Sequence, residues 1–298
     1  MTDGLRTFDG GVAIVTGAAS GIGRAISEAL ALRGSQVVLA DVDLDDAETA
    51  AGQIRDKGGQ ASAKRLDVSR FVDFQTLAND TVAQLGRIDY VFNNAGIGVV
   101  GEVADYTMDA WDRILGVNLL GVIHGVHSVY PVMLRQGFGH IVNTASMAGL
   151  TLAPGMASYT TTKHAVVALS WALRAEAQSR GVRVSVFCPG VIRTPLLGGG
   201  RHGIFLGSTP EKRQRELAHE FFARLRPMPA PVFARKALDQ VARNKATIIV
   251  PGWWRVFWWL ERAFPALALF VARKGVERAR QLLDAETPRR LVADERRG

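Results

Sequence analysis

The sequence predicts an α/β protein built on a doubly wound parallel sheet with helices on both faces. Two observations carry this prediction. Short β-branched runs alternate with helical stretches from residue 12 to about residue 188, a rhythm typical of repeated βα units. A glycine-rich turn follows the first run and opens a helix. In such sheets the ligand crevice lies at the carboxyl ends of the strands, so we expect the functional site there.

Six short runs bounded by turn residues are the expected strands. They are Val12–Thr16, Gln36–Ala40, Ala61–Leu66, Tyr90–Asn93, His140–Thr144 and Arg183–Phe187. Helical stretches are expected between them, because apolar residues recur there every three or four positions. Examples are Ile22–Arg33 and Leu44–Lys57. The glycine cluster at 198–200 marks the end of this regular pattern.

The chain has 298 residues, of which 48% are hydrophobic, enough to bury a large core. We expect a single domain over residues 1–252, with a substrate loop at about 195–230, and an appendage over residues 253–298. The net charge of +8 is uneven: residues 1–198 carry 16 Lys/Arg and 18 Asp/Glu, whereas residues 199–298 carry 20 and 10. The basic character belongs to the last third, and because the sequence has no zinc-knuckle or aromatic-basic ribbon signature, no nucleic-acid partner is predicted.

Few residues of the chain are candidates for thiol or metal chemistry. Cys188 is the only cysteine, which excludes an internal disulfide and suits a reducing cytosol. It lies in an apolar run, Val184–Cys188, so a buried, inert thiol is expected. The spacing of His124 and His127 could pair them on a helix, but they lack carboxylate or cysteine partners nearby, so we expect no metal site. The segment Met1–Gly11 lacks an apolar export signal, and a cytoplasmic location is expected.

The glycine-rich turn, Thr16-Gly17-Ala18-Ala19-Ser20-Gly21-Ile22-Gly23, is a candidate phosphate cradle. Residues without a Cβ let the backbone turn tightly, approach a pyrophosphate and pack the next helix against the sheet. A strand-to-helix turn can require glycine for geometry alone. Its position between an apolar strand and a helix nevertheless favours dinucleotide binding. The candidate contacts are Gly17, Ser20, Gly21, Ile22 and Gly23.

An acidic residue follows the second expected strand, 18 residues beyond Gly23. Asp41 can accept hydrogen bonds from both hydroxyls of an adenosine ribose and would repel a 2′-phosphate. The sequence therefore predicts NAD in preference to NADP. The alternative is that Asp41 only begins a turn with Asp43 and Asp45. Asp67, after the third strand, is a second candidate near the adenine edge, although it could instead cap the next helix.

Six motifs in register resemble the short-chain dehydrogenase/reductase family over roughly residues 10 to 195. They are Thr16–Gly23, Asn93-Asn94-Ala95-Gly96, Asn118, Ser146, Tyr159-x3-Lys163 and Pro189-Gly190. The resemblance implies a Rossmann-type sheet of seven strands, a nicotinamide cofactor, and catalysis by Ser146, Tyr159 and Lys163 with support from Asn118. It further implies cofactor contacts at Val68, Asn93, Ala95, Gly96, Tyr159, Lys163, Pro189, Gly190, Ile192 and Thr194. Asn93 and Asn94 could equally satisfy backbone groups at a strand end.

The residue types also fit the exchange of a secondary alcohol with a ketone. This reaction needs a group that takes the hydroxyl proton as hydride leaves the carbinol carbon and returns it on reduction. Tyr159 can do so only if its pKa falls from about 10. Lys163 lies one helical turn away, so its ammonium is expected to lower that pKa. Ser146 is expected to hold the substrate oxygen by a hydrogen bond.

Rival functions fit the residues less well. Epimerases and dehydratases with a Tyr-x3-Lys pair resemble chains with another glycine spacing, and enoyl reductases usually place more residues between Tyr and Lys. A sensor or scaffold that binds NAD without turnover need not keep Ser146, Tyr159 and Lys163 together. The resemblance also implies a homodimer or homotetramer through segments at about 107–136 and 155–180. The physiological substrate and the favoured direction are not determined by these residues.

The segment after residue 252 is the part that the family pattern explains least. Trp253, Trp254, Trp258 and Trp259 lie within seven positions, and more apolar residues follow. The uncharged run Ala263–Ala272 has only ten residues, too few to span a bilayer. Three interpretations stay open: a membrane interface, a cover over an apolar substrate pocket, or packing against a subunit. The tryptophans with flanking cations predict peripheral association with anionic membranes and a lipophilic substrate drawn from them.

Overall fold

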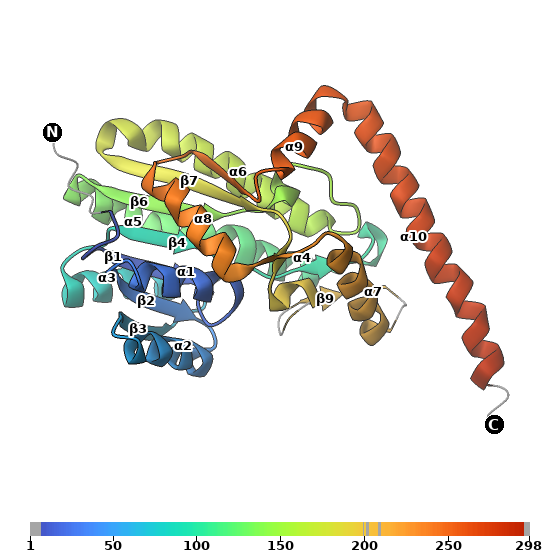
Figure 1. The fold of residues 1–298 in the computed structure, drawn as a ribbon, viewed down its shortest axis with the longest axis horizontal. Coiled ribbons are helices and arrows are strands. Elements are labelled where there is room, and N and C mark those ends of the chain that lie inside the picture. The colour runs from blue at the N-terminus through green and yellow to red at the C-terminus, as the bar shows by residue number, and fades with distance from the viewer. Residues whose placement is uncertain (1–6, 199, 201–202, 208–209, 295–298) are drawn as a thin grey trace.

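A seven-stranded parallel sheet forms the centre of the protein in the computed structural model (Figure 1). The structure describes residues 7–198, 200, 203–207 and 210–294, with side chains from 282 onward left out. The strand order is β11-β7-β6-β4-β1-β2-β3. The strands are β1 (Val12–Thr16), β2 (Gln36–Asp41), β3 (Gln60–Arg65), β4 (Tyr90–Asn93), β6 (Gly139–Thr144), β7 (Val182–Pro189) and β11 (Thr247–Val250).

Helices cover both faces of this sheet, each over its own apolar core. One core packs α1 (Gly21–Ala31), α2 (Leu44–Asp56) and α8 (Ala230–Ala242) on one face. The other packs α3 (Phe71–Leu85), α5 (Gly121–Gln136) and α6 (Ala157–Ala177) on the opposite face. The doubly wound α/β prediction is therefore confirmed, and the six expected strands are all present within one or two residues of their expected bounds.

Several elements were not predicted from the residue pattern. The seventh strand, β11, lies beyond the region where strands and helices alternate regularly. Two short parallel pairs join distant loops: β5 (Val99–Val100) with β9 (Ile204–Phe205), and β8 (Ile192–Arg193) with β10 (Met228–Pro229). The other unpredicted elements are α4 (Met108–Leu115), α7 (Glu211–Arg224), the π-helical turn η2 (Gly116–Leu120) and the 3-10 turns η1 (Val103–Asp105), η3 (Met147–Gly149), η4 (Gln178–Arg180) and η5 (Pro195–Gly198).

Two helices follow the last strand of the sheet. They are α9 (Trp254–Ala263) and α10 (Pro265–Asp294), and α10 stands at one side of the molecule (Figure 1). The division of the chain at residue 252 falls between β11 and α9 and stays a prediction. Parts of three predicted segments lie outside the described residues, namely residues 1–6, 199, 201–202, 208–209 and 295–298.

One helical stretch among the described residues, Met108–Gln136, is long and apolar enough to cross a membrane. Half of its most apolar window is buried inside the protein. This stretch packs against α3 and the sheet, so it is accounted for as a core helix.

The sheet topology fixes where a ligand can bind. β1 lies between β2 and β4 with all three strands parallel, so the strand order reverses at β1. The crevice of a doubly wound sheet opens at such a switch point, beyond the carboxyl ends of the strands. Thr16, Asp41 and Asn93 are the last residues of these three strands.

Candidate active site

The glycine turn after β1 has a backbone that larger residues would not tolerate. Gly17 and Gly21 have positive φ angles of 64° and 55°, a region that favours glycine. A Cβ on Gly23 would lie 2.1 Å from the Gly17 carbonyl oxygen. The first turn of α1 contains no acidic residue, and Ser20 at its N-cap makes no capping hydrogen bond. The start of this helix can therefore accept an anion.

Thr16, to which sequence analysis assigned no role, joins this turn to the loop after β4. Its hydroxyl accepts hydrogen bonds from the amides of Asn94 (2.9 Å) and Ala95 (3.0 Å). The Asn94 side chain donates to the Thr16 carbonyl at 3.0 Å. A Cβ on Gly17 would lie 2.8 Å from Ala95 Cα, so the two loops are in close contact. The only sequence signal was the place of Thr16 inside the glycine motif.

The Asp41 carboxylate lies against the glycine turn. It accepts a hydrogen bond from the Ala19 amide at 2.9 Å and another from the Asp43 amide at 3.1 Å. The second bond is the turn that sequence analysis considered as the alternative, and the first places the carboxylate beside the cofactor loop. Asp41 therefore has a structural role, and its position is also suitable for binding a ribose.

Asp67 and Val68 lie in the loop between β3 and α3. The Asp67 carboxylate accepts hydrogen bonds from the Ser69 amide (3.0 Å) and hydroxyl (2.6 Å). This local turn precedes α3, whose N-cap is Arg70, so Asp67 does not cap that helix. The Val68 carbonyl is hydrogen-bonded to His124 Nδ1 at 2.8 Å. His124 thus has a packing role, and the described residues contain no cluster of three side chains that could ligate a metal.

The Asn93 side chain joins two strands of the sheet and does not face the crevice. This side chain is 2% exposed and donates to Asn143 Oδ1 at 2.8 Å, which joins β4 to β6. A Cβ on Gly125 would lie 2.1 Å from Asn93 Oδ1, so α5 closes over the amide. Because the side chain points into the protein, only the backbone of Asn93 can border the crevice.

Ser146, Tyr159 and Lys163 come together at the carboxyl edge of the sheet, as predicted. Ser146 follows β6 and caps the short η3 turn, where its Oγ accepts a hydrogen bond from the Ala148 amide at 3.1 Å. Tyr159 lies in the first turn of α6 and is hydrogen-bonded to Ser146. Lys163, one turn later, donates to the Thr144 carbonyl at 2.9 Å, and its Nζ is 5.5 Å from the centre of the tyrosine ring.

The electrostatics of this group differ from the sequence-based expectation. Burial raises the pKa of the Tyr159 phenol, and the hydrogen bond from Ser146 opposes this rise. Lys163 is 3% exposed, and burial lowers its pKa to about 8. The expected lowering of the Tyr159 pKa by Lys163 is therefore wrong for this structure, because desolvation dominates at both groups. The protonated phenol that results is the form that donates a proton to a ketone.

Asn118 is buried in η2, a π-helical turn, which is an irregularity often found at functional sites. Its amide accepts a hydrogen bond from the Ile97 amide at 2.8 Å and donates to the Ile97 carbonyl at 2.9 Å. A Cβ on Gly96 would lie 3.3 Å from Asn118 Oδ1 and 3.4 Å from Lys163 Nζ. The two polar side chains therefore flank one space, which the glycine keeps open.

The segment from Pro189 to Thr194 closes over the glycine turn. A Cβ on Gly21 would lie 3.3 Å from the Thr194 side chain, so β8 and the start of α1 face each other. Ile192 is buried below this contact. A Cβ on Gly190 would lie 2.1 Å from Trp254 Nε1, a contact that nothing in the sequence indicated. Cys188 is fully buried, as expected, and burial raises the pKa of its thiol.

Apolar side chains line the space beside Tyr159. Ile97, Val99 and Ile114 form a small buried cluster against which the tyrosine packs. Four other partly buried residues pack against this cluster, namely Tyr106, Val117, Ile204 and Leu206. The residues packed against Tyr159 are thus mostly apolar, whereas Lys163 and Asn118 are buried polar groups of the same site.

Comparisons with known proteins agree with this geometry. The family model described as short chain dehydrogenase matches residues 11–203. Cyclohexanol dehydrogenase of Acinetobacter sp. (strain SE19) is 36% identical over 64% of this chain and 76% of its own length. The 1-deoxy-11-beta-hydroxypentalenate dehydrogenase of Streptomyces exfoliatus is 38% identical over 63% of this chain and 69% of its own length.

A solved structure extends the likeness to most of the chain. The crystal structure of a short chain dehydrogenase/reductase from Burkholderia phymatum in complex with NAD is 32% identical, with a TM-score of 0.81. The match covers 88% of this chain and 96% of that chain. The fold is thus shared with a protein crystallised with NAD.

Proposed function

The chain belongs to the short-chain dehydrogenase/reductase family, and we propose that it interconverts a secondary alcohol and a ketone with NAD as the hydride carrier. The observation that carries this proposal is the hydrogen-bonded pair of Ser146 and Tyr159 above the buried Lys163 ammonium. The three groups lie at the edge of the sheet where a doubly wound fold binds its ligand.

The residues at that edge fit a nicotinamide dinucleotide. The pyrophosphate would be held by the start of α1, with Ser20 and Thr194 on either side of Gly21. The adenosine ribose would be held by Asp41, whose carboxylate is already fixed against the glycine turn. A 2′-phosphate beside this carboxylate would be repelled by about 4 kcal/mol at ~4 Å and an effective dielectric of about 20. This repulsion supports NAD in preference to NADP.

Each catalytic side chain has a role that follows from its position. When bound, the nicotinamide accepts hydride from the carbinol carbon or returns it. The Ser146 hydroxyl, fixed by the Ala148 amide, would orient the substrate oxygen next to the phenol. Tyr159 would exchange the hydroxyl proton with that oxygen. Lys163 would supply positive charge beneath the tyrosine ring, and Asn118 would border a proton path through the space beside Gly96.

The apolar walls support a lipophilic substrate. Tyr159 packs against an apolar cluster that includes Ile97, Ile204 and Leu206, so a substrate beside the phenol would lie next to hydrocarbon. Burying such surface favours a ring or an alkyl chain by about 25 cal/mol per Å². Two relatives, cyclohexanol dehydrogenase and the hydroxypentalenate dehydrogenase, are named for cyclic alcohols.

We further propose that the enzyme is a homodimer or homotetramer assembled through α4, α5 and α6. Met108 is 70% exposed on α4, and Trp171 is 40% exposed on α6. These large apolar side chains lie within the two segments that the family resemblance implies for assembly. Sedimentation velocity would test the assembly, and a monomer at micromolar concentration would refute it.

NAD-coupled assays on secondary alcohols graded by ring number and chain length test the proposed reaction. We expect NAD reduction with cyclic or long-chain alcohols and little with propan-2-ol. Only the larger substrates would contact the apolar residues beside Tyr159. NADP should be used less efficiently than NAD. Cofactor binding without turnover on the whole panel, in both directions, would refute the enzyme and favour a sensor.

A further inference from the structure

Ten large apolar side chains are exposed on α9, α10 and the residues beside them. Their exposed fractions range from 47% at Trp253 to 63% at Trp259. The set is Trp253, Val256, Phe257, Trp259, Leu260, Phe264, Leu267, Leu269, Phe270 and Val271. Concentrated apolar exposure of this kind marks a surface that binds a partner or a membrane.

In α9 the exposed apolar residues lie on the side that faces away from the protein. Trp254 and Trp258 point inward and pack with Met147 and Leu150. At 100° per residue, Val256, Trp259 and Leu260 lie on the opposite side of the helix. Arg255 and Arg262, seven residues apart, follow one edge of that side. The helix is therefore amphipathic, with a basic margin beside its exposed apolar face.

In α10 the apolar stripe leads into a basic one. Leu267 and Val271 lie four positions apart in α10, and Phe264 lies just before this helix; all three are more than half exposed. Lys274 and Arg278 follow Val271 at intervals of three and four, so they lie on the same side of the helix. Below, the term outward face is used for the following residues: Val256, Phe257, Trp259, Leu260, Phe264, Leu267, Phe270 and Val271.

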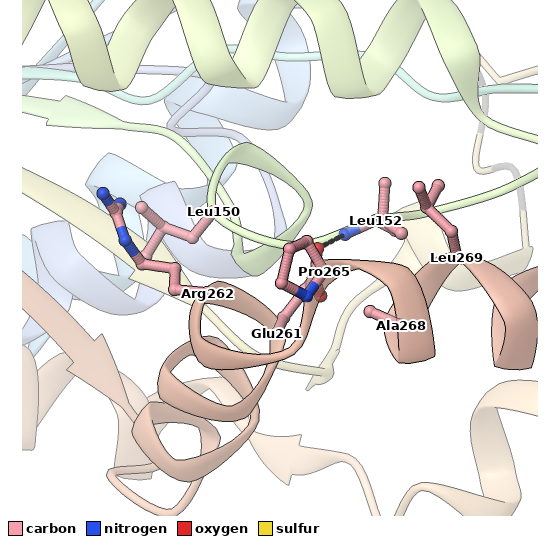
Figure 2. Close-up of a pocket in the computed structure, with 7 residues that line it drawn as sticks. All are labelled: Leu150, Leu152, Glu261, Arg262, Pro265, Ala268 and Leu269. Atoms are coloured by element: carbon pink, nitrogen blue, oxygen red, sulfur yellow. Dashed lines mark hydrogen bonds between the residues drawn. The ribbon is translucent and has the colours of Figure 1, made fainter.

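The inner sides of both helices are held against the protein, which fixes the outward face in place. Glu261 accepts a hydrogen bond from the Leu152 amide at 2.7 Å, and Leu150 and Pro265 lie at the same junction (Figure 2). Further along α10, Arg280 forms a two-point ion pair with Glu102 at 2.6 and 2.5 Å. The exposed side chains are therefore not free to fold back onto the protein.

We propose that the outward face binds the surface of an anionic lipid bilayer. The positive charge of this segment favours an anionic bilayer over a second copy of the chain as the binding partner. Residues 253–281 carry six cations and two acids, and pairing of Arg280 with Glu102 leaves a net charge of +3. Self-association about a two-fold axis would bring two positively charged surfaces together, and they would repel each other. Anionic lipid headgroups would neutralise it while the tryptophan and phenylalanine side chains enter the interface.

The proposed contact lies in the plane of the membrane. α9 has only ten residues, and α10 becomes charged from Arg273 onward, so neither helix offers the roughly 20 apolar residues that a span requires. The contact goes beyond the proposed dehydrogenase activity, and its test requires no turnover.

Co-sedimentation of the full chain with lipid vesicles tests the proposal. One vesicle set contains phosphatidylcholine alone, and the other contains phosphatidylcholine with phosphatidylserine, both at low ionic strength. The charge variant is Arg255→Gln/Lys274→Gln/Arg278→Gln. Its matched control is Lys236→Gln/Arg243→Gln/Lys245→Gln, which removes three exposed cations on and just after α8. The apolar variant is Trp259→Ser/Phe270→Ser.

We expect the full chain to bind the anionic vesicles and to bind phosphatidylcholine much more weakly. The charge variant should lose about a hundredfold in partitioning, the control should lose clearly less, and the apolar variant should lose at least about tenfold. No sedimentation of the full chain with anionic vesicles would overturn the proposal. Equal losses in the charge variant and its control would also overturn it, as would an apolar variant that dissociates a dimer without changing vesicle binding.

Discussion

Replacing Lys163 by methionine should stabilise the folded protein while it inactivates the enzyme. Methionine has a similar length and no charge, so it fills the same buried space beneath Tyr159. Burial lowers the pKa of Lys163 from 10.5 to about 8, which means that the fold disfavours the ammonium that the proposed chemistry uses. Lys163→Met therefore separates the effect of this charge on stability from its role in catalysis.

The magnitude follows from the pKa of Lys163. Each pKa unit corresponds to about 1.36 kcal/mol, so the shift represents about 3 kcal/mol of destabilisation at neutral pH. The variant also loses the hydrogen bond to the Thr144 carbonyl, which offsets about half of the gain. We expect a net increase of about 1 to 2 kcal/mol in the free energy of unfolding.

The pH dependence provides the sharper test. Between about pH 8 and about pH 10.5 the unfolded chain binds a proton on Lys163 that the folded chain has released. The free energy of unfolding of the wild type therefore rises with pH through that window, and the advantage of the variant shrinks. Below about pH 8 the advantage is fully present.

Urea unfolding of the wild type and Lys163→Met at about pH 7 and about pH 10 measures both effects. Lys245→Met is the matched control, because Lys245 is exposed and should show neither effect. A variant less stable than the wild type at about pH 7, or an advantage that grows with pH, would refute this account of the site's electrostatics.

Three other changes follow from the structure. Asp41→Asn keeps an acceptor for the Ala19 amide but removes the charge, so kcat/KM for NADP relative to NAD should rise at least about tenfold; an unchanged ratio would remove Asp41 from cofactor choice. Burial lowers the pKa of His140 to about 3, so the free energy of unfolding should fall by up to about 1.4 kcal/mol per unit as pH drops below about 6.5, because the unfolded state binds the extra proton. His140→Gln should flatten that slope, and an equal slope in both proteins would contradict it. Gly190→Ala should weaken NADH binding, since the new methyl group would overlap Trp254; Trp254→Ala should restore binding in the double variant, and no rescue would show that this contact is not the cause.

Local patterns were sufficient to predict the strands and the positions of the main motifs. Val12–Thr16 and Tyr90–Asn93 have the predicted bounds because each is a short apolar run ending at a turn. The same local signal does not reach β11, which follows the end of α8 after four intervening residues and pairs with β7, about 60 residues earlier. Its partner is determined by tertiary packing.

The direction of the Tyr159 pKa shift was not available from the sequence for a related reason. The Tyr-x3-Lys spacing correctly predicted that the two side chains would be neighbours. How strongly each is desolvated depends on residues from other elements, such as Ile97, Val99 and Thr144. The spacing therefore predicted that Lys163 would lie near the phenol. It did not predict that burial would decide the direction of the Tyr159 pKa shift.

Asn93 and Trp254 show two further limits. Asn93 ends its strand, and which face its side chain occupies depends on the register with Asn143 across β4 and β6. Trp254 reaches Gly190 from a helix more than 60 residues later, and nothing in the sequence relates the two positions. Both contacts are set by the arrangement of distant segments.

Turnover by Tyr159→Phe is the most direct test of the proposed site. The substitution removes the hydroxyl that Ser146 contacts but leaves the buried ring, so folding and NADH binding should be retained. We predict a fall in kcat of at least about 10²-fold with the best secondary alcohol from the NAD-coupled assays. NADH binding, measured by fluorescence titration in the same preparation, should stay within a few-fold of the wild type. A variant that turns over within a few-fold of the wild type would contradict the assignment of Tyr159 as the acid and base.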